Sequence, residues 1–505
     1  MPADIDAIVL KAMRAAPGER YADVAALAAD LQRHLDSRPV LARRGQWWYR
    51  ARRFVRRHRS GVAAIAAIAV LLAGFAFERE AQLRRTELER DKAQALAAFM
   101  RGLFEDADPS RTRGSRLTVA QALDLGVERL RDDAGLAPEV RAALLLSVGR
   151  GYTALDMGDR AIPLLREADA LLERASAPPL ERGRAKAALR RAYSMALDTA
   201  SATVTGHEAI ALLQRAPGAD PDEIRRVRIN LLFDHITVGD RPLEMLAAEL
   251  ESIVEGLERR SDADPELLIQ ALAALAVAQA AAGHDDAAAR RADRALAIAR
   301  TLYGPEDPAL AYYRFTAALS RMRSDPEEAV RAYRRQIADY ESTNDGPTPG
   351  LGAMLAYLGW TLERMGRHEE SVAALQRAER VAGRFAAVAP DFHLYVLSGL
   401  AAQYQRLGRS DEAVSLLRPQ LSRTDEAARR ATAWAVNGRI RGLNVMGEAA
   451  LQRGDAEEAA RHFGMALAEA ERRPDRARAS LRSAAAAGLC STGTVRPACP
   501  GLATR

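Results

Sequence analysis

The sequence has few of the residues that build β-sheets. Only 5% of its 505 residues are aromatic, and runs of β-branched residues are scarce. Alanine, leucine, arginine and glutamate, which favour helices, dominate instead. With 48% apolar residues, the chain has room for two to four domains and enough material for a sizeable core. The sequence therefore predicts an all-α protein.

Residues for metal, redox or nucleophilic chemistry are equally sparse. The eight histidines are scattered without metal-ligand spacing, and Ser, His and Asp form no nucleophile motif. Only two cysteines occur, Cys490 and Cys499, in the proline- and glycine-containing stretch GLCSTGTVRPACPG. A disulfide between them and two free thiols on a tail both remain open. We expect no catalytic residue, bound metal or cofactor in this chain.

Acidic residues are absent from Leu41 to Phe77, whereas this window holds eight arginines. Subtracting its charge of +8 from the total of +6 leaves −2 for the rest of the chain. Because the basic charge is local and precedes an apolar run, it does not indicate nucleic-acid binding. It indicates a membrane flank.

The apolar run is GVAAIAAIAVLLAGFAF, residues 61–77, and contains no charge. As a helix it covers about 26 Å, slightly less than a bilayer core of roughly 30 Å. Eight arginines precede it, and five basic residues mixed with acids follow it between Glu78 and Gln94. The positive-inside rule then places the N-terminus in the cytoplasm of a bacterium and the C-terminus outside its inner membrane. A buried core helix is the alternative.

The segments on either side of this run also have a recognisable character. Residues 43–60 form a basic juxtamembrane segment, in which Trp47 and Phe54 share one helical face. Residues 78–135 are expected to form a stalk and connecting helices, because proline is missing until Pro109. The stalk leucines keep no strict heptad, so that a homodimeric coiled coil is only weakly indicated.

One phrase recurs after residue 136. Its clearest copies are LGWTLERMGRHEESVAALQRA, LAAQYQRLGRSDEAVSLLRPQ and MGEAALQRGDAEEAARHFGMA. In each copy a small residue allows two helices to pack closely, a glycine seven residues later forms the turn, and a bulky residue nine positions after that glycine lies on the second helix. The turn glycines are Gly366, Gly408 and Gly454. Each copy predicts one helical hairpin.

Looser copies extend the pattern. They predict turns at Gly158, Gly239, Gly283 and Ser324, with a less regular hairpin near Thr205. The copy at Gly158 closes its turn two residues early. From Gly283 onward the turns are 41, 42, 42 and 46 residues apart. The spacing predicts a stack of hairpins.

These hairpins resemble tetratricopeptide repeats over residues 138–473, best at Gly149, Tyr152, Ala161 and Ala168. The first-helix tryptophan of that family is mostly missing, and the period is nearer 42 than the usual 34. The resemblance implies an α-solenoid whose first helices line a groove for peptides or protein segments. Repeats that merely space or oligomerise the protein are the alternative.

The first forty residues contain two short amphipathic helices interrupted at Pro17 and Gly18, too small to form a core alone. The stretch DIDAIVLKAMRAAPGERYADVAALAADLQRHL resembles the last helices of the C-terminal lobe of bacterial Ser/Thr protein kinases. In that family the arginine at the position of Arg20 pairs with the glutamate of an Ala-Pro-Glu motif. A basic segment, one span, a stalk and repeats follow, the order of a group of membrane-anchored kinases.

The motifs of phosphoryl transfer are missing. Ala137-Pro138-Glu139 is interpreted as a helix start, Asp391-Phe392-His393 as part of a repeat linker, and His58-Arg59-Ser60 as the membrane flank. ATP and Mg²⁺ would bind only to a kinase portion that this chain lacks. We therefore expect the chain alone to be inactive as an enzyme, and Met1 to be a misplaced start or the start of a truncated gene.

Six segments are expected: a kinase-lobe remnant (1–42), a juxtamembrane segment (43–60), a transmembrane helix (61–77), a stalk (78–135), a solenoid (136–473) and a C-terminal tail (474–505). Together they indicate the sensor region of a membrane-anchored Ser/Thr kinase. A membrane-tethered scaffold without kinase function, and a soluble regulator without a span, are the alternatives. The expected partners are the membrane and a protein or peptide in the groove.

Overall fold

The computed structural model describes residues 3–36, 38–43, 51, 54–55, 59–106, 118–133, 135–343, 346–423, 432–474 and 477–493. Within these ranges the regular structure is helical, with no strand. The chain divides into two units, residues 1–91 and 92–505, which are described separately. The predicted basic juxtamembrane segment, residues 43–60, lies largely outside the described residues.

The first unit begins with two short helices, α1 (Ala3–Ala12) and α2 (Val24–Leu35), with the short 3-10 turns η1 (Pro17–Glu19) and η2 (Leu41–Arg43). Asp23 caps α2 by accepting a hydrogen bond from Ala26 N at 2.6 Å. The buried carboxylate of Asp30 accepts bonds from Tyr21 Oη, Leu41 N and Ala42 N at 2.7, 2.6 and 2.9 Å. These bonds hold residues 41–43 against α2.

The helix α4 (Arg59–Asp106) contains the predicted span. Two helices among the described residues are long and apolar enough to cross a membrane, α4 and α12 (Pro265–Ala282), with mean hydropathies of 2.3 and 1.5 over their most apolar windows. More than half of the α12 window is buried in the repeat unit, whereas none of the α4 window is buried. The side chains of Val70, Leu71 and Phe77 are 70–79% exposed.

The second unit begins within α4. Phe99 of α4 packs with Leu123 and Leu130 of α5 (Val119–Asp132) in the same apolar cluster as the first repeat. Thr118 and Gln121 form a capping box at the start of α5, with bonds of 2.9 and 3.2 Å. The apolar core of the repeats therefore extends into the segment predicted to be a stalk.

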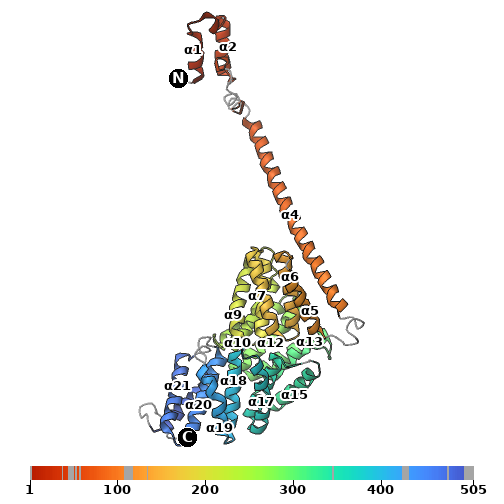
Figure 1. Cartoon of the computed structure of the whole chain (residues 1–505), viewed down its shortest axis with the longest axis vertical. Helices are drawn as coiled ribbons and strands as arrows, with labels where there is room; N and C mark the ends of the chain where they lie inside the picture. The colour runs from red at the N-terminus through yellow and green to blue at the C-terminus, as the bar shows by residue number, and fades with distance from the viewer. Residues whose placement is uncertain are drawn as a thin grey trace. The chain divides into compact units, whose positions relative to one another are not determined.

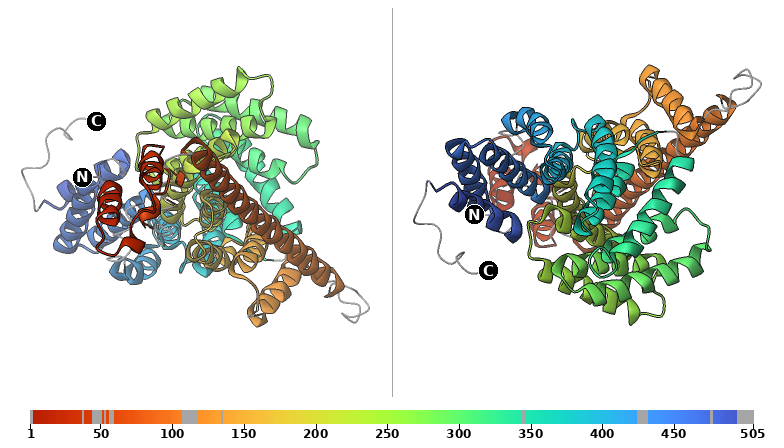
Figure 2. Two further views of the ribbon diagram at one scale, coloured as in Figure 1. Left: turned by 90° about the horizontal axis from the view of Figure 1, so that it is seen from above. Right: turned by 90° about the horizontal axis from the view of Figure 1, so that it is seen from below.

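Eight helical hairpins follow in the described part of the chain, and Figure 1 shows them stacked in sequence order. Their helices are α6 (Pro138–Ala154) and α7 (Gly158–Arg174), α8 (Pro179–Met195) and α9 (Thr199–Arg215), α10 (Pro221–Val238) and α11 (Leu243–Glu258), α12 and α13 (Asp285–Tyr303), α14 (Leu310–Ser320) and α15 (Pro326–Thr343), α16 (Pro349–Arg364) and α17 (His368–Arg384), α18 (Pro390–Arg406) and α19 (Ser410–Arg423), and α20 (Ala433–Gln452) and α21 (Ala456–Arg472). The colours of Figure 2 pass around the unit from orange through green to blue, as in a coiled stack.

The turn glycines have the expected backbone. Gly366, Gly408 and Gly454 have φ angles of +73°, +74° and +79°, in the left-handed region where a side chain is disfavoured. A Cβ on any of them would meet nothing within 4 Å, so that the glycine is required by backbone conformation rather than by space. These three residues end the first helices of their hairpins.

The small residues of the first helices allow close packing, as the pattern predicts. A Cβ on Gly359 would lie 2.6 Å from Leu375 Cγ, and one on Gly447 would lie 2.8 Å from the ring of Phe463. Both distances are shorter than any real contact of a Cβ atom. The bulky side chain of each second helix thus occupies the space left by glycine on the first helix.

Two turns differ from the prediction. Near Gly158 the left-handed residue is Asp156 (φ +57°), while Gly158 itself begins α7 and packs against Ala192 O and Ala196. The hairpin predicted near Thr205 is α8/α9, whose turn contains Leu197 (φ +62°), so that Thr205 lies inside α9. In both turns a residue other than glycine adopts the strained conformation, and a glycine-based pattern therefore misplaces the turn.

The segment predicted as a C-terminal tail contains a helix, α22 (Ala479–Ser491). Ala485 joins the apolar cluster of Val436 and Ala466, and Leu489 packs beside Phe463. The alanine-rich sequence of α22 favours a helix. Without α22, the apolar face of the last hairpin would be exposed to water. The helix therefore covers the end of the stack.

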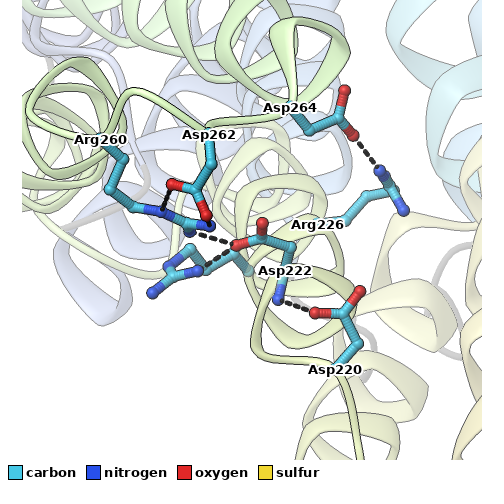
Figure 3. A network of polar contacts seen from close by, with 7 residues as sticks. Asp220, Asp222, Arg226, Arg260, Asp262 and Asp264 are labelled. Atoms are coloured by element: carbon cyan, nitrogen blue, oxygen red, sulfur yellow. Dashed lines mark hydrogen bonds and ion pairs between the residues drawn. The ribbon is translucent and has the colours of Figure 1, made fainter.

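Ion pairs connect neighbouring hairpins at intervals close to the repeat length. Arg226 of α10 pairs with Asp264, and Arg260 pairs with Asp222, at 2.7 and 2.8 Å (Figure 3). Asp264 also accepts a hydrogen bond from the backbone N–H of Glu266 at the start of α12, and Asp220 accepts one from that of Asp222 at the start of α10. The hydrogen bond from Arg260 lowers the pKa of Asp222. Asp264 thus caps α12 and also joins this helix to α10.

Candidate functional site

The first helices of the last three hairpins, α16, α18 and α20, form the interior of the repeat stack. Each is buried on most of its surface, whereas the second helices α17 and α21 bury mainly one stripe. This is the arrangement expected when first helices line the concave side of a solenoid. A site in this interior would be built from α16, α18 and α20.

A row of aromatic rings runs through this interior. The ring centroid of Phe315 lies 5.6 Å from that of Tyr357, Tyr357 lies 5.1 Å from Trp360, and Trp360 lies 4.9 Å from Tyr395. These separations are in the range of favourable aromatic contacts. Burial, followed by the nearby Tyr395, raises the pKa of Tyr357 to about 12. Tyr357 is therefore neutral at physiological pH.

Two arginines lie against the end of this row. The guanidinium of Arg441, from α20, lies 5.0 Å from the ring centroid of Tyr395, and that of Arg478 lies 5.6 Å from it. Both distances fit cation–π contacts. The aromatic row thus brings positive charge into the interior of the last hairpins.

Gly399 of α18 lies between two hydrogen-bond donors. A Cβ at this position would be 3.0 Å from Trp360 Nε1 and 3.2 Å from Arg441 Nη1. Both nitrogens are buried and make no hydrogen bond. An unpaired buried donor is costly, typically about 1–3 kcal/mol, so that two converging ones suggest an acceptor that is supplied from elsewhere. An indole N–H and a guanidinium together suit a carboxylate or carbonyl oxygen.

Amide side chains nearby are also incompletely paired. Gln403 Oε1 accepts a hydrogen bond from His368 Nδ1–H at 2.9 Å, while Gln403 Nε2 is buried without a partner. Neither amide atom of Gln405 has a partner, and Asn444 lacks one at Oδ1. These side chains come from α18 and α20. The candidate site is therefore an interior with buried donors and acceptors that have no partner within the described residues.

The residues singled out from the sequence do not form one site. Arg20 belongs to the first unit, where Nε and Nη2 donate to Arg14 O and Ala15 O at 2.5 and 3.1 Å. Gly366, Gly408 and Gly454 lie in three separate turns. Cys490 lies near the end of α22, and Cys499 lies outside the described residues, so the disulfide stays a prediction.

The kinase look-alikes fall in ordinary helical positions. Ala137-Pro138-Glu139 begins α6, as interpreted from the sequence. Asp391-Phe392-His393 lies in the first turn of α18 rather than in a linker, because Pro390 starts that helix and Phe392 packs in the core. His58 lies outside the described residues, and Arg59 and Ser60 begin α4.

Sequence reasoning did not find Trp360, Gly399 and Arg441 as a group. They are about forty residues apart in successive first helices, so their convergence follows from the way the hairpins stack. One signal was present: Gly399 lies inside the mostly apolar stretch LYVLSGLAA of α18 and is not needed for a turn. Such a glycine often marks a close approach.

The repeat unit is an α-solenoid of stacked helical hairpins. No protein-family model matches the chain, and no curated protein matches it in sequence. Among solved structures, a Rap protein complexed with competence and sporulation factor is 14% identical, covering 70% of this chain and 97% of its own, with a TM-score of 0.44. A human IFIT1 dimer with m7Gppp-AAAA is 13% identical (74% and 76% covered, TM-score 0.45).

A third solved structure of the same kind is the apo form of the quorum sensor NprR from B. thuringiensis. It is 11% identical and covers 75% of this chain and 99% of its own, with a TM-score of 0.43. At such identities and scores these similarities say nothing about a ligand. The proposal below therefore depends on the chain's own residues.

Proposed function

We propose that the repeat unit binds a peptide or protein segment through a carboxylate, in the interior formed by α16, α18 and α20. The observation that carries this proposal is the convergence of Trp360 Nε1 and Arg441 Nη1 around Gly399, both without an acceptor. A ligand carboxylate accepts from both donors. The aromatic row and the amides of Gln403 and Gln405 then contact the rest of an extended segment.

The test is a peptide selection on the purified chain in detergent micelles. We expect enrichment of peptides with a free C-terminal carboxylate or an acidic side chain, and loss of their binding when that group is amidated. Gly399→Ala fills the space between the two donors and should weaken binding at least tenfold. Gly464→Ala is the matched control, because a Cβ on this helical glycine meets nothing within 4 Å.

The proposal would be contradicted if the Gly399→Ala and Gly464→Ala variants bound the selected peptides with the same affinity. Equal binding of the free and amidated peptides would also contradict it, because the two donors would then have no part in recognition.

We further propose that this unit is the extracytoplasmic sensor of a membrane-anchored Ser/Thr protein kinase. The apolar, wholly exposed stretch of α4 supports a membrane span. The exposed apolar side chains of the first unit support a larger partner domain: Met13, Val24 and Leu35 are 74–80% exposed. A solvated face of this kind is unfavourable unless another surface covers it.

Two experiments test the anchoring and the kinase link. A periplasm-active reporter fused after Arg505 should be active, and a cytoplasmic one silent; the reverse would contradict the topology. The DNA upstream of Met1 should encode kinase motifs in the same frame. Its lack of Asp-Phe-Gly and His-Arg-Asp would favour the membrane-tethered scaffold instead, and extraction of the chain into the supernatant would favour a soluble regulator.

A further inference from the structure

Two histidines that are 28 residues apart in sequence meet in the repeat unit. His207 lies in α9 and His235 in α10, and their Nε2 atoms are 3.2 Å apart. The ring centroids are 5.3 Å apart, with an angle of 63° between the ring planes. The two imidazoles therefore meet through the same ring nitrogen, from two consecutive hairpins.

The far side of His235 is fixed by a carboxylate. Its Nδ1 lies 2.7 Å from Asp240 Oδ1, so that Nδ1–H donates to this oxygen. The proton then sits on Nδ1, and the lone pair of Nε2 faces His207. An imidazole oriented by a carboxylate on its second nitrogen is the usual arrangement of a metal-binding histidine.

The separation of the nitrogens fits a shared metal ion. Two zinc–nitrogen bonds of about 2.0–2.1 Å that meet at a tetrahedral angle place the nitrogens about 3.4 Å apart. His207 is exposed and His235 is buried, so that an ion could enter from the solvent on the His207 side. No group of three or more His, Cys, Asp or Glu side chains with metal-binding geometry occurs in the described residues. Water would complete the coordination.

The charged side chains next to this pair interact with other residues. Asp234 accepts hydrogen bonds from Arg190 Nη1 and Ser194 Oγ at 2.6 and 2.7 Å. Arg241 forms an ion pair with Glu249 at 3.0 Å. The imidazoles therefore interact with each other and, through Nδ1 of His235, with Asp240.

We propose that His207 and His235 bind one divalent transition-metal ion, such as Zn²⁺, through their Nε2 atoms, with Asp240 orienting His235. The ion joins the hairpin α8/α9 to the hairpin α10/α11. This site is separate from the interior around Gly399 and does not depend on the ligand proposed there.

The experiment is titration of Zn²⁺ into the chelator-treated full chain in detergent micelles, followed by calorimetry. The wild type should bind one Zn²⁺ ion. His207→Gln should bind this ion at least tenfold more weakly than the wild type. His284→Gln, which changes an exposed histidine beside Glu244, is the control and should retain it. Asp240→Asn should weaken binding about 10- to 100-fold, the usual effect of removing such a carboxylate.

The unfolding temperature, measured with and without Zn²⁺, distinguishes loss of metal binding from a variant that fails to fold. Zn²⁺ should raise the unfolding temperature of the wild type and of His284→Gln, but not of His207→Gln, whose metal-free unfolding temperature should match the wild type. Absence of a one-ion event in the wild type, or an unchanged affinity in His207→Gln, would overturn the proposal. The two imidazoles would then simply share a hydrogen bond.

Discussion

Asp156 and Tyr340 are joined by a hydrogen bond across 184 residues. The hydroxyl of Tyr340 donates to Asp156 Oδ2 at 3.1 Å, and the same oxygen accepts from Gly350 N at 3.1 Å and from the hydroxyl of Thr348. Asp156 lies in the α6/α7 turn, and its partners lie at the end of α15 and the start of α16. The first hairpin is thereby linked to the fifth and the sixth, which a stack with neighbour contacts alone would not achieve.

This contact predicts a pH dependence. Burial raises the pKa of Asp156 to about 6 from 3.8, against the opposing effect of hydrogen bonds from Thr348, Tyr340 and Gly350, and Asp159 contributes a smaller rise. Because the folded-state pKa is the higher one, the contribution of Asp156 to stability is complete below about pH 4 and is lost as the pH rises through about 6.

The variant Asp156→Asn removes this titration. Asparagine tolerates the left-handed backbone of this position and still accepts a hydrogen bond. We expect the variant to gain stability over the wild type between pH 4 and 7, by up to about 3 kcal/mol for a shift of this size. Thermal unfolding across this pH range measures it, and parallel profiles for the two proteins would contradict the prediction.

The turn glycines predict a purely conformational effect. Gly408→Ala places a side chain in the left-handed region without any clash, and should cost roughly 1–2 kcal/mol. Gly408→Asn should cost less, because asparagine adopts this conformation more readily. Denaturant unfolding measures both changes. An alanine variant as stable as the wild type would show that the turn rearranges.

The small residues of the first helices predict a steric effect instead. Gly359→Ala brings a Cβ within 2.6 Å of Leu375 Cγ, so that the hairpin must separate or Leu375 must leave its rotamer. We expect a loss of about 1–3 kcal/mol, as for other overpacked cores. The double variant with Leu375→Ala should recover part of this loss. Additive effects in the double variant would mean that the two residues are not in contact.

In the first unit, we expect Asp30 to stabilise the backbone of residues 41–43 against α2. The carboxylate of Asp30 accepts hydrogen bonds from three donors, and Asp30→Asn would point an amide N–H at one of them. Because that hydrogen bond is lost, residues 41–43 should detach from α2. Hydrogen exchange at the amides of Leu41 and Ala42 should accelerate by more than tenfold. Asp6→Asn, at an exposed position of α1, is the control and should leave both amides unchanged.

The local part of this fold could be predicted from sequence, and the non-local part could not. The spacing of Gly366, Gly408 and Gly454 predicts their turns, because a left-handed residue after a helix is usually glycine. The turns at Asp156 and Leu197 were misplaced because surrounding packing holds other residues in the same conformation. Helix α22 was missed because its partner is the last hairpin.

The candidate site depends on the same distinction. Gly399 alone marks a close approach in the sequence. Nothing there indicates that it meets Trp360 and Arg441, since their approach is set by how far each hairpin is rotated against the next. His207 and His235 were judged scattered for the same reason, although their rings meet between α9 and α10. Pitch and rotation of the stack arise from many small packing contacts rather than from a motif.

The most direct test of ligand binding observes the indole N–H of Trp360 itself. Its ¹H–¹⁵N resonance, assigned with Trp360→Phe, should move downfield when a selected carboxylate peptide is added, because the free donor gains a charged acceptor. The indole of Trp434 serves as the internal reference, and Gly399→Ala should abolish the shift. A Trp360 resonance that does not move while the peptide binds would contradict the proposed site.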